Sequence, residues 1–172
     1  MLVTGQVWVF PGQWGSVAFF AFLLAGLGET IGQRSGVLNL GVDGVMLLSA
    51  FGAYWTILET GRPVAGLLVG LGVGLVMGVV YGVVTVTLRA EQGVSGIGIF
   101  LFGLGMSDLL FQKKVGPPLP VRGFGEWHVP VLSRIPKVGE MFFQHSVLVY
   151  LAFLLVPLVA FLLNRTTFGL KV

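Results

Sequence analysis

A short polar cluster interrupts the otherwise apolar stretch of residues 37–58. Its members are Asn39, Gly41, Asp43 and Gly44. An ionised carboxylate near a bilayer centre costs roughly 2.5–3.5 kcal/mol on insertion scales, so it needs a partner or a watery cavity. Asn and Asp cap helix N-termini well, and glycine permits an unwound backbone. The cluster therefore predicts a discontinuous helix whose second half starts inside the membrane, where transporters build substrate sites.

We treat these four residues as candidates for lining a substrate pathway. For Asp43 a structural role is the alternative, in which its carboxylate caps the half-helix or pairs with Arg34. Glu29 and Arg34 flank the turn after the first apolar stretch, so we expect a surface ion pair there. Asp108 precedes two lysines near the end of a later apolar stretch and is expected to be interfacial.

A run of glycines with a period of four residues gives the chain its sharpest internal pattern. On a helix, residues four apart share one face, so the run predicts a nearly continuous small-residue face. Such a face lets another helix approach backbone to backbone, and helix packing is the expected role. Lining a pathway is the alternative role. The glycines are Gly66, Gly70, Gly74, Gly78 and Gly82.

Several kinds of chemistry have no motif in this sequence. There is no P-loop, no nucleophile elbow and no HExxH pair, so we expect a protein that is not an enzyme and leaves ATP hydrolysis to another subunit. The chain has no cysteine, and His128 and His145 lack metal-ligand spacing. We therefore expect neither a metal site nor a cofactor.

The composition identifies the class of protein. Of 172 residues, 55% are hydrophobic and 10% are charged, and the mean hydropathy is +0.95. A soluble domain carries about 25% charged residues. A soluble enzyme and a disordered chain are thereby excluded, and an all-α, polytopic membrane protein is predicted. The net charge of +3 does not indicate nucleic-acid binding, because the basic residues lie between apolar segments.

We expect a helical bundle of about five membrane spans. A helix needs about 20 apolar residues to cross the hydrocarbon core. Two predicted spans lie in stretches free of Asp, Glu, Lys and Arg, whereas the other three require polar or charged groups to be admitted. The predicted spans are residues 14–32, 37–58, 64–88, 94–111 and 146–163, with a long loop at 112–145.

Residues 28–44, which read GETIGQRSGVLNLGVDG, closely resemble the start of ABC-importer permeases. The branch is that of the nucleoside and simple-sugar permeases, which are related to the ribose and branched-chain amino acid permeases. Gln33 and Asp43 stand where that family usually has Glu, and Asp43 is shorter by one methylene group. Three further stretches resemble the same branch, namely residues 88–96, 130–143 and 151–170.

The resemblance implies the membrane-spanning subunit of an ATP-driven importer, which moves a nucleoside or a simple sugar past residues 39–44. It implies three partners, namely a separate ATPase, a second permease subunit and an extracellular solute-binding protein. It also implies the cell membrane of a bacterium or an archaeon. Because family members are usually much longer, residues 1–172 are expected to be the N-terminal part of a permease domain.

The orientation in the membrane follows from basic residues and from the resemblance. Arg34 is the first basic residue, which favours an outside N-terminus and puts Arg89, Arg165 and Lys171 inside. Charge counting alone would place the loop 112–145 inside, because it holds five basic residues. The resemblance places that loop outside, and we expect it there.

Three functions are alternatives to a nucleoside or sugar importer. A non-transporting membrane scaffold or assembly subunit would have the same composition. A branched-chain amino acid permease is the alternative within the family. An ion-coupled secondary transporter would be expected to show a second, inverted half with matching broken helices, and no half-length repeat is visible.

Overall fold

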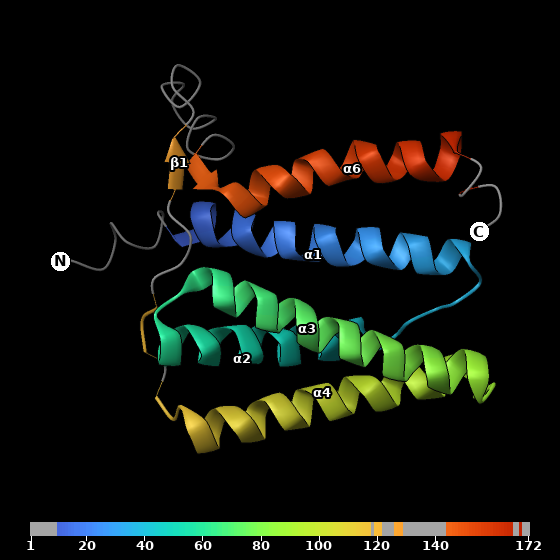
Figure 1. Ribbon diagram of the computed structural model, residues 1–172, viewed down its shortest axis with the longest axis horizontal. Coiled ribbons are helices and arrows are strands. Elements are labelled where there is room, and N and C mark those ends of the chain that lie inside the picture. The colour runs from blue at the N-terminus through green and yellow to red at the C-terminus, as the bar shows by residue number, and fades with distance from the viewer. Residues whose placement is uncertain (1–9, 118, 122–125, 129–143, 167–168, 170–172) are drawn as a thin grey trace. The chain divides into compact units, whose positions relative to one another are not determined.

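Figure 1 shows the computed structural model, which describes residues 10–117, 119–121, 126–128, 144–166 and 169. Nearly all of this described part is α-helical, in helices of 19 to 25 residues, so the predicted all-α fold class is confirmed. The chain divides into two compact units, Met1–Ile31 with Phe124–Val172, and Gly32–Gly123. Residues 122–125 and 129–143 of the predicted outer loop lie outside the described residues.

The first unit contains two long helices and a small antiparallel ribbon. Its elements are α1 (Phe10–Arg34), β1 (Glu126–His128), β2 (Gln144–Ser146) and α6 (Val147–Arg165). The strand register pairs Trp127 with His145, and β2 leads directly into α6. Leu23 of α1 packs against the buried side chains of Val149 and Ala152 of α6.

The second unit carries the polar cluster. Its elements are α2 (Val42–Thr60), α3 (Pro63–Gly82), a π-helical turn η1 (Val83–Thr87) and α4 (Gln92–Lys114). Gly61 ends α2 with a left-handed φ of 65°, which glycine adopts without strain. Pro63 then starts α3 at its first turn, where a missing N–H costs nothing. The connection between the two helices is therefore a short, sharply defined turn.

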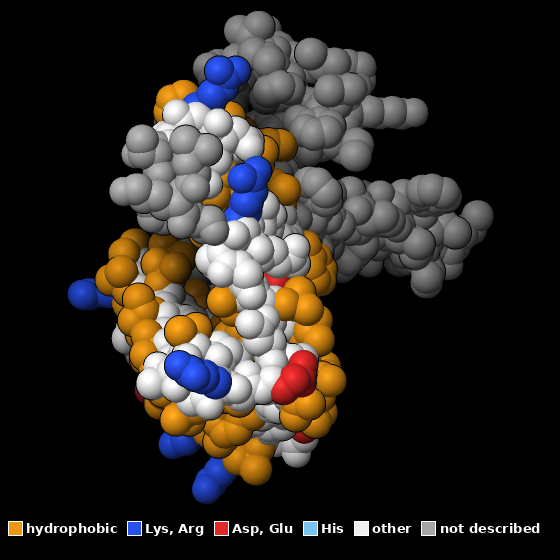
Figure 2. All heavy atoms as spheres, turned by 90° about the vertical axis from the view of Figure 1, so that its right-hand side faces the viewer, with side chains coloured by type: hydrophobic (Ala, Val, Ile, Leu, Met, Phe, Trp, Pro, Cys, Tyr) orange, Lys and Arg blue, Asp and Glu red, His pale blue; other side chains and the backbone are white. Residues whose placement is uncertain are grey.

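Within the part of the chain that the structure describes, three helices are long and apolar enough to cross a membrane, namely Pro63–Thr87, Gln92–Lys114 and Leu148–Arg165. Their large side chains are widely exposed within the chain, and Leu75 of α3 is 69% exposed. Figure 2 views the end where α3 finishes and α4 begins, and shows basic side chains at this end with hydrophobic ones around the flanks. This surface suits contact with lipid or with further helices. Crossing by α1 and α2 remains a prediction.

The glycine run of α3 approaches α2 along only part of its length. A Cβ built on Gly66 would lie 2.8 Å from the carbonyl oxygen of Ala53. One on Gly70 would lie 3.3 Å from the carbonyl oxygen of Ser49. Gly74 has more room, with the Ser49 hydroxyl at 3.5 Å, and Gly78 and Gly82 meet no described atom within 4 Å. The small-residue face thus packs on α2 at the beginning of α3 and leaves its later part uncovered among the described residues.

Candidate functional site

The segment between α1 and α2 is not helical, and α2 begins only at Val42. That this break lies inside a membrane span remains a prediction. Gly36 has a left-handed φ of 80°, and the chain then runs to the start of α2 at Val42 without a helix. The Asn39 side-chain oxygen accepts a hydrogen bond from the backbone N–H of Gly41 at 2.9 Å. This local turn aims the backbone into α2, a common use of asparagine. We call residues 36–41 the broken segment.

The Gln92 side chain clamps the broken segment to the first turn of α4. Its amide oxygen accepts a hydrogen bond from the N–H of Leu38 at 2.8 Å. Its amide nitrogen donates to the carbonyl oxygen of Gly36 at 3.2 Å. One side chain therefore satisfies an N–H and a C=O that lie two residues apart, as a residue of a neighbouring strand would.

The Tyr81 hydroxyl completes this clamp from α3. Tyr81 is only 4% exposed, and its hydroxyl lies within hydrogen-bond distance of the carbonyl oxygens of Leu38 and Gln92. Because a hydroxyl carries one proton, the two carbonyls share it. The π-helical turn η1 follows directly after Tyr81 and Gly82. Two helices, α3 and α4, thus converge on the broken segment, and it is bound at both a backbone donor and backbone acceptors.

The start of α2 packs against α4 with almost no side chain between the two backbones. A Cβ on Gly41 would lie 2.8 Å from the carbonyl oxygen of Gly96, and one on Gly44 would lie 2.6 Å from the Cα of Phe100. A Cβ on Gly103 would overlap the carbonyl group of Gly44. Gly41, Gly44, Gly96 and Gly103 are all buried. We call these four residues the glycine contact, and only glycine fits there.

Glu91 starts α4 with a side-chain cap. Its carboxylate accepts hydrogen bonds from the N–H groups of Val94 at 2.6 Å and Gly93 at 2.9 Å. These two bonds stabilise the ionised form and lower the pKa of Glu91 below its usual value. The cap fixes the turn in which Gln92 reaches the broken segment. Just before it, Arg89 has a φ of 55°, an uncommon conformation for a side chain other than glycine.

The structure gives the four pathway candidates different surroundings. Gly41 and Gly44 belong to the glycine contact, whereas Asn39 turns back to its own backbone. Asp43 is exposed in the first turn of α2, and the N-cap residue of that helix is Gly41, which has no side-chain cap. No hydrogen bond is therefore formed by Asp43 at the cap. The Glu29–Arg34 ion pair stays a prediction, and both residues lie in the last two turns of α1.

The depth of the broken segment can be read from α4. With 23 residues, α4 is about 35 Å long, enough to cross a bilayer. The broken segment contacts Gln92 and Gly96, in the first turns of this helix. It therefore lies towards the end of the span at which Arg89 is found. We missed the roles of Gln92 and Tyr81 in the sequence, because polar partners far apart along the chain leave no local pattern.

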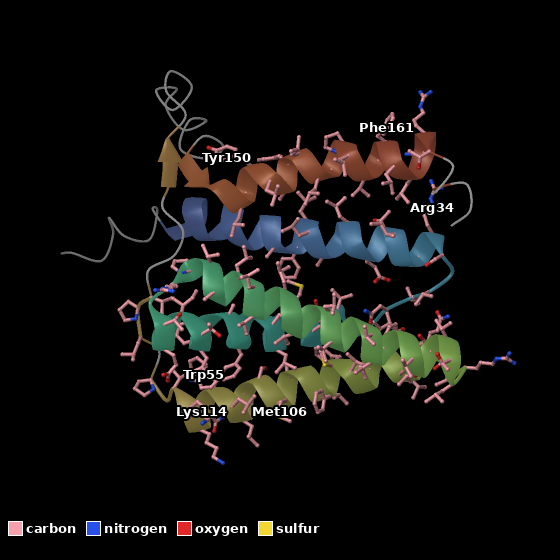
Figure 3. All side chains as sticks on the ribbon, in the orientation of Figure 1. Arg34, Trp55, Met106, Lys114, Tyr150 and Phe161 are labelled. Carbon is pink, nitrogen blue, oxygen red and sulfur yellow. The ribbon has the colours of Figure 1, made fainter. Side chains whose placement is uncertain are left out.

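At the opposite end of the α2–α4 pair, where Figure 3 labels Trp55 and Lys114, side chains of α2 contact α4 and the chain after it. The Tyr54 hydroxyl donates to the carbonyl oxygen of Leu119 at 2.7 Å and accepts from its N–H at 2.8 Å. The Lys114 ammonium lies 5.5 Å from the centroid of the Trp55 ring, within the range of a cation–π contact. These contacts attach the chain after α4 to the end of α2.

The Asp43 carboxylate can be neutralised with little effect on the fold. In Asp43→Asn, α2 should lose only its favourable charge–dipole term, about 0.3–1 kcal/mol. If the carboxylate interacts with solute or with a basic partner during transport, uptake by the full-length complex should fall about tenfold. We expect this loss at unchanged protein level, measured by radiolabelled uptake and immunoblotting. Glu59→Gln, in the last turn of the same helix, is the control, and equal uptake by both variants would assign Asp43 a structural role.

The fold defines a class, that of polytopic helical membrane proteins. Residues 15–172 match the family described as the permease component of branched-chain amino acid transport systems. The chain belongs to this permease family, and the resemblance seen in the sequence is confirmed. No solved structure matches the chain.

Three relatives have names that describe transport. The chain is 38% identical over 154 residues to a protein of Haloferax volcanii provisionally named as a glucose ABC transporter permease. It is 31% identical over 158 residues to a nucleoside ABC transporter permease of Lactococcus lactis, and 30% identical over 163 residues to a guanosine ABC transporter permease of Bacillus subtilis. Each match covers 87% of this chain, but only 46% of the first relative and 50% of the other two. The chain spans about half the length of these relatives.

Proposed function

We propose that the chain is part of the permease subunit of an ATP-driven ABC importer that translocates a nucleoside or a simple sugar. One observation carries this proposal. The three relatives named for glucose, nucleoside and guanosine transport match the same large share of the chain, including the broken segment. The three helices that are long and apolar enough to cross a membrane support the proposal further.

Within this proposal, each group of residues has a task. Asn39, Gly41, Asp43 and Gly44 lie beside the pathway at the inner end of α2, and the glycine run of α3 packs helices. ATP hydrolysis belongs to a separate subunit. The partners are that ATPase, a second permease subunit and an extracellular solute-binding protein. The setting is the cell membrane of a bacterium or an archaeon.

Two rival functions have less support. Transport of branched-chain amino acids fits the description of the family, but the printed names of the three relatives refer to glucose and nucleosides. A scaffold that transports nothing would leave the clamp on the broken segment without an evident purpose. We therefore favour a sugar or a nucleoside as solute.

Uptake of radiolabelled solutes tests the solute class. Cells that express the full-length permease with its ATPase and binding protein are given radiolabelled guanosine, glucose or leucine, and compared with cells that lack the permease gene. We expect permease-dependent uptake of guanosine or glucose and none of leucine. Uptake of leucine alone would support the amino acid alternative. Uptake of none of the three would favour the scaffold.

Single cysteines test the proposed orientation. Leu88 and Leu119 are 68% and 54% exposed, and they lie beyond opposite ends of α4. Residues 1–172 contain no cysteine, so an introduced thiol in this part reports cleanly. In the full-length protein in intact cells, we expect Leu119→Cys to react with a membrane-impermeant maleimide and Leu88→Cys to react only after the cells are opened. The reverse pattern would put the loop 112–145 inside, as counting its basic residues suggests.

A further inference from the structure

An open groove of 590 Å³ lies between α2 and α4, beyond the glycine contact. Its walls are formed by residues 47–54 of α2 and residues 104–111 of α4. At Gly44 and Gly103 the two backbones touch. Past this point the groove is lined by Phe51, Tyr54 and Phe111, on the side of the pair where Figure 3 labels Trp55 and Lys114. Its volume is in the range of about 300–1,000 Å³ that is usual for small-molecule sites.

The walls of the groove combine aromatic rings with a few polar groups. The rings of Tyr54 and Phe111 stack with centroids 5.9 Å apart. Ser107 and Asp108 line the groove from α4. The Asp108 carboxylate accepts a hydrogen bond from the Gln112 side chain at 2.8 Å, which restrains its orientation. Aromatic faces and one or two well-placed acceptors are what a sugar ring needs, since its C–H face stacks and its hydroxyls donate.

Asp108 also argues against lipid as the occupant. It is the one acidic residue in the candidate span Gln92–Lys114. A carboxylate in a membrane span is costly against hydrocarbon and almost always faces a watery cavity or a protein interior. Asp108 is exposed in the structure and lines the groove, so water or a polar solute suits this position better than lipid does.

We propose that this groove is a solute subsite at the outer end of the permease, where Asp108 accepts hydrogen bonds from the vicinal hydroxyls of a sugar ring. The ring stacks on the aromatic wall of Phe51, Tyr54 and Phe111. Glucose and the ribose of a nucleoside share this vicinal diol, which links the solutes named for the relatives. The proposal rests on the function and orientation proposed above. It adds to them a recognition chemistry and a site distinct from the broken segment.

Thiol protection tests what fills the groove. Ala50 lines it and is exposed, so Ala50→Cys in the full-length complex should react with a water-soluble methanethiosulfonate. We expect guanosine or glucose, each added alone at high concentration without the binding protein, to slow this reaction severalfold. Leu109→Cys is the control, because Leu109 is 58% exposed on α4 but does not line the groove. No reaction at Ala50→Cys would show that a helix or lipid fills the groove. A reaction that neither solute slows would show that the groove holds only water. Either result overturns the proposal.

A substitution of Asp108 tests the recognition chemistry. Asp108→Asn keeps the size of the side chain but weakens its hydrogen bonds to hydroxyls, so uptake should fall at least about tenfold while complex yield is unchanged. Glu59→Gln, outside the groove, should transport normally. Undiminished uptake by Asp108→Asn beside an active wild type would overturn the subsite and leave the importer function intact. Absence of wild-type uptake would overturn the importer function instead, and the thiol result would still decide the groove.

Discussion

Replacing Gly103 by alanine should destabilise the full-length permease by about 1–3 kcal/mol, and replacing it by leucine should abolish its fold. A Cβ at this position would overlap the carbonyl group of Gly44, and a backbone group cannot turn aside as a side chain can. The two helices would have to separate along the glycine contact, with loss of the packing that drives association of helices in membranes. Thermal unfolding of the detergent-purified protein measures the effect.

Gly98 provides the matched control on the same helix. A Cβ there meets no described atom within 4 Å, and Gly98 is exposed. Alanine favours a helix over glycine by about 1 kcal/mol, so Gly98→Ala should be neutral or slightly stabilising. Equal unfolding midpoints for Gly98→Ala and Gly103→Ala would show that α2 and α4 do not touch at Gly44.

Replacing Gln92 by leucine should lower the stability of the permease by roughly 2–4 kcal/mol and release the broken segment. The Leu38 N–H and the Gly36 carbonyl would each lose their partner. The released chain next to Arg34 should become a good substrate for trypsin. Limited proteolysis of the full-length protein, followed by mass spectrometry, detects cleavage after Arg34.

Gln92→Glu separates the two bonds of this clamp. A glutamate still accepts from the Leu38 N–H, but it cannot donate to the Gly36 carbonyl. We therefore expect cleavage after Arg34 at a rate between those of the wild type and Gln92→Leu. If all three proteins are cut equally slowly, the broken segment is held by other contacts.

The break before α2 could be predicted because its signal is local. Asn39, Gly41, Asp43 and Gly44 are polar or small residues in an apolar run, and such residues favour turns and helix starts. The same rule could not assign their individual roles. Asn39 makes the turn through its side chain, whereas Asp43 lies on the exposed side of α2 and forms no cap. Which member of a polar cluster forms the turn depends on backbone angles that composition does not contain.

The packing of glycines was predicted where they recur and missed where they do not. The four-residue period of α3 stands out in the sequence, yet a neighbouring helix follows it only as far as Gly74. The closer contact involves Gly96 and Gly103, which are seven residues apart, or two helical turns, and therefore share a face. That spacing was available as a signal. Its partner pair, Gly41 and Gly44, lies about sixty residues earlier and could be matched to it only by the fold.

The long-range polar contacts left no such signal. Tyr81 and Gln92 hold a segment more than forty residues away, and Tyr54 holds Leu119 across 65 residues. Single tyrosines and glutamines in apolar stretches occur for many reasons. The groove was missed in the same way, because its lining comes from two helices that lie far apart in the sequence.

ATP-driven accumulation of solute in reconstituted vesicles is the most direct test of the central claim. The full-length permease, its ATPase and its binding protein are reconstituted into proteoliposomes, with radiolabelled guanosine or glucose and the binding protein outside. The account predicts accumulation only when ATP is inside the vesicles, on the side of the membrane where the ATPase is bound. It predicts no accumulation when a non-hydrolysable ATP analogue replaces ATP. Accumulation driven by a proton or sodium gradient without ATP, or none of either solute with ATP present, would contradict it.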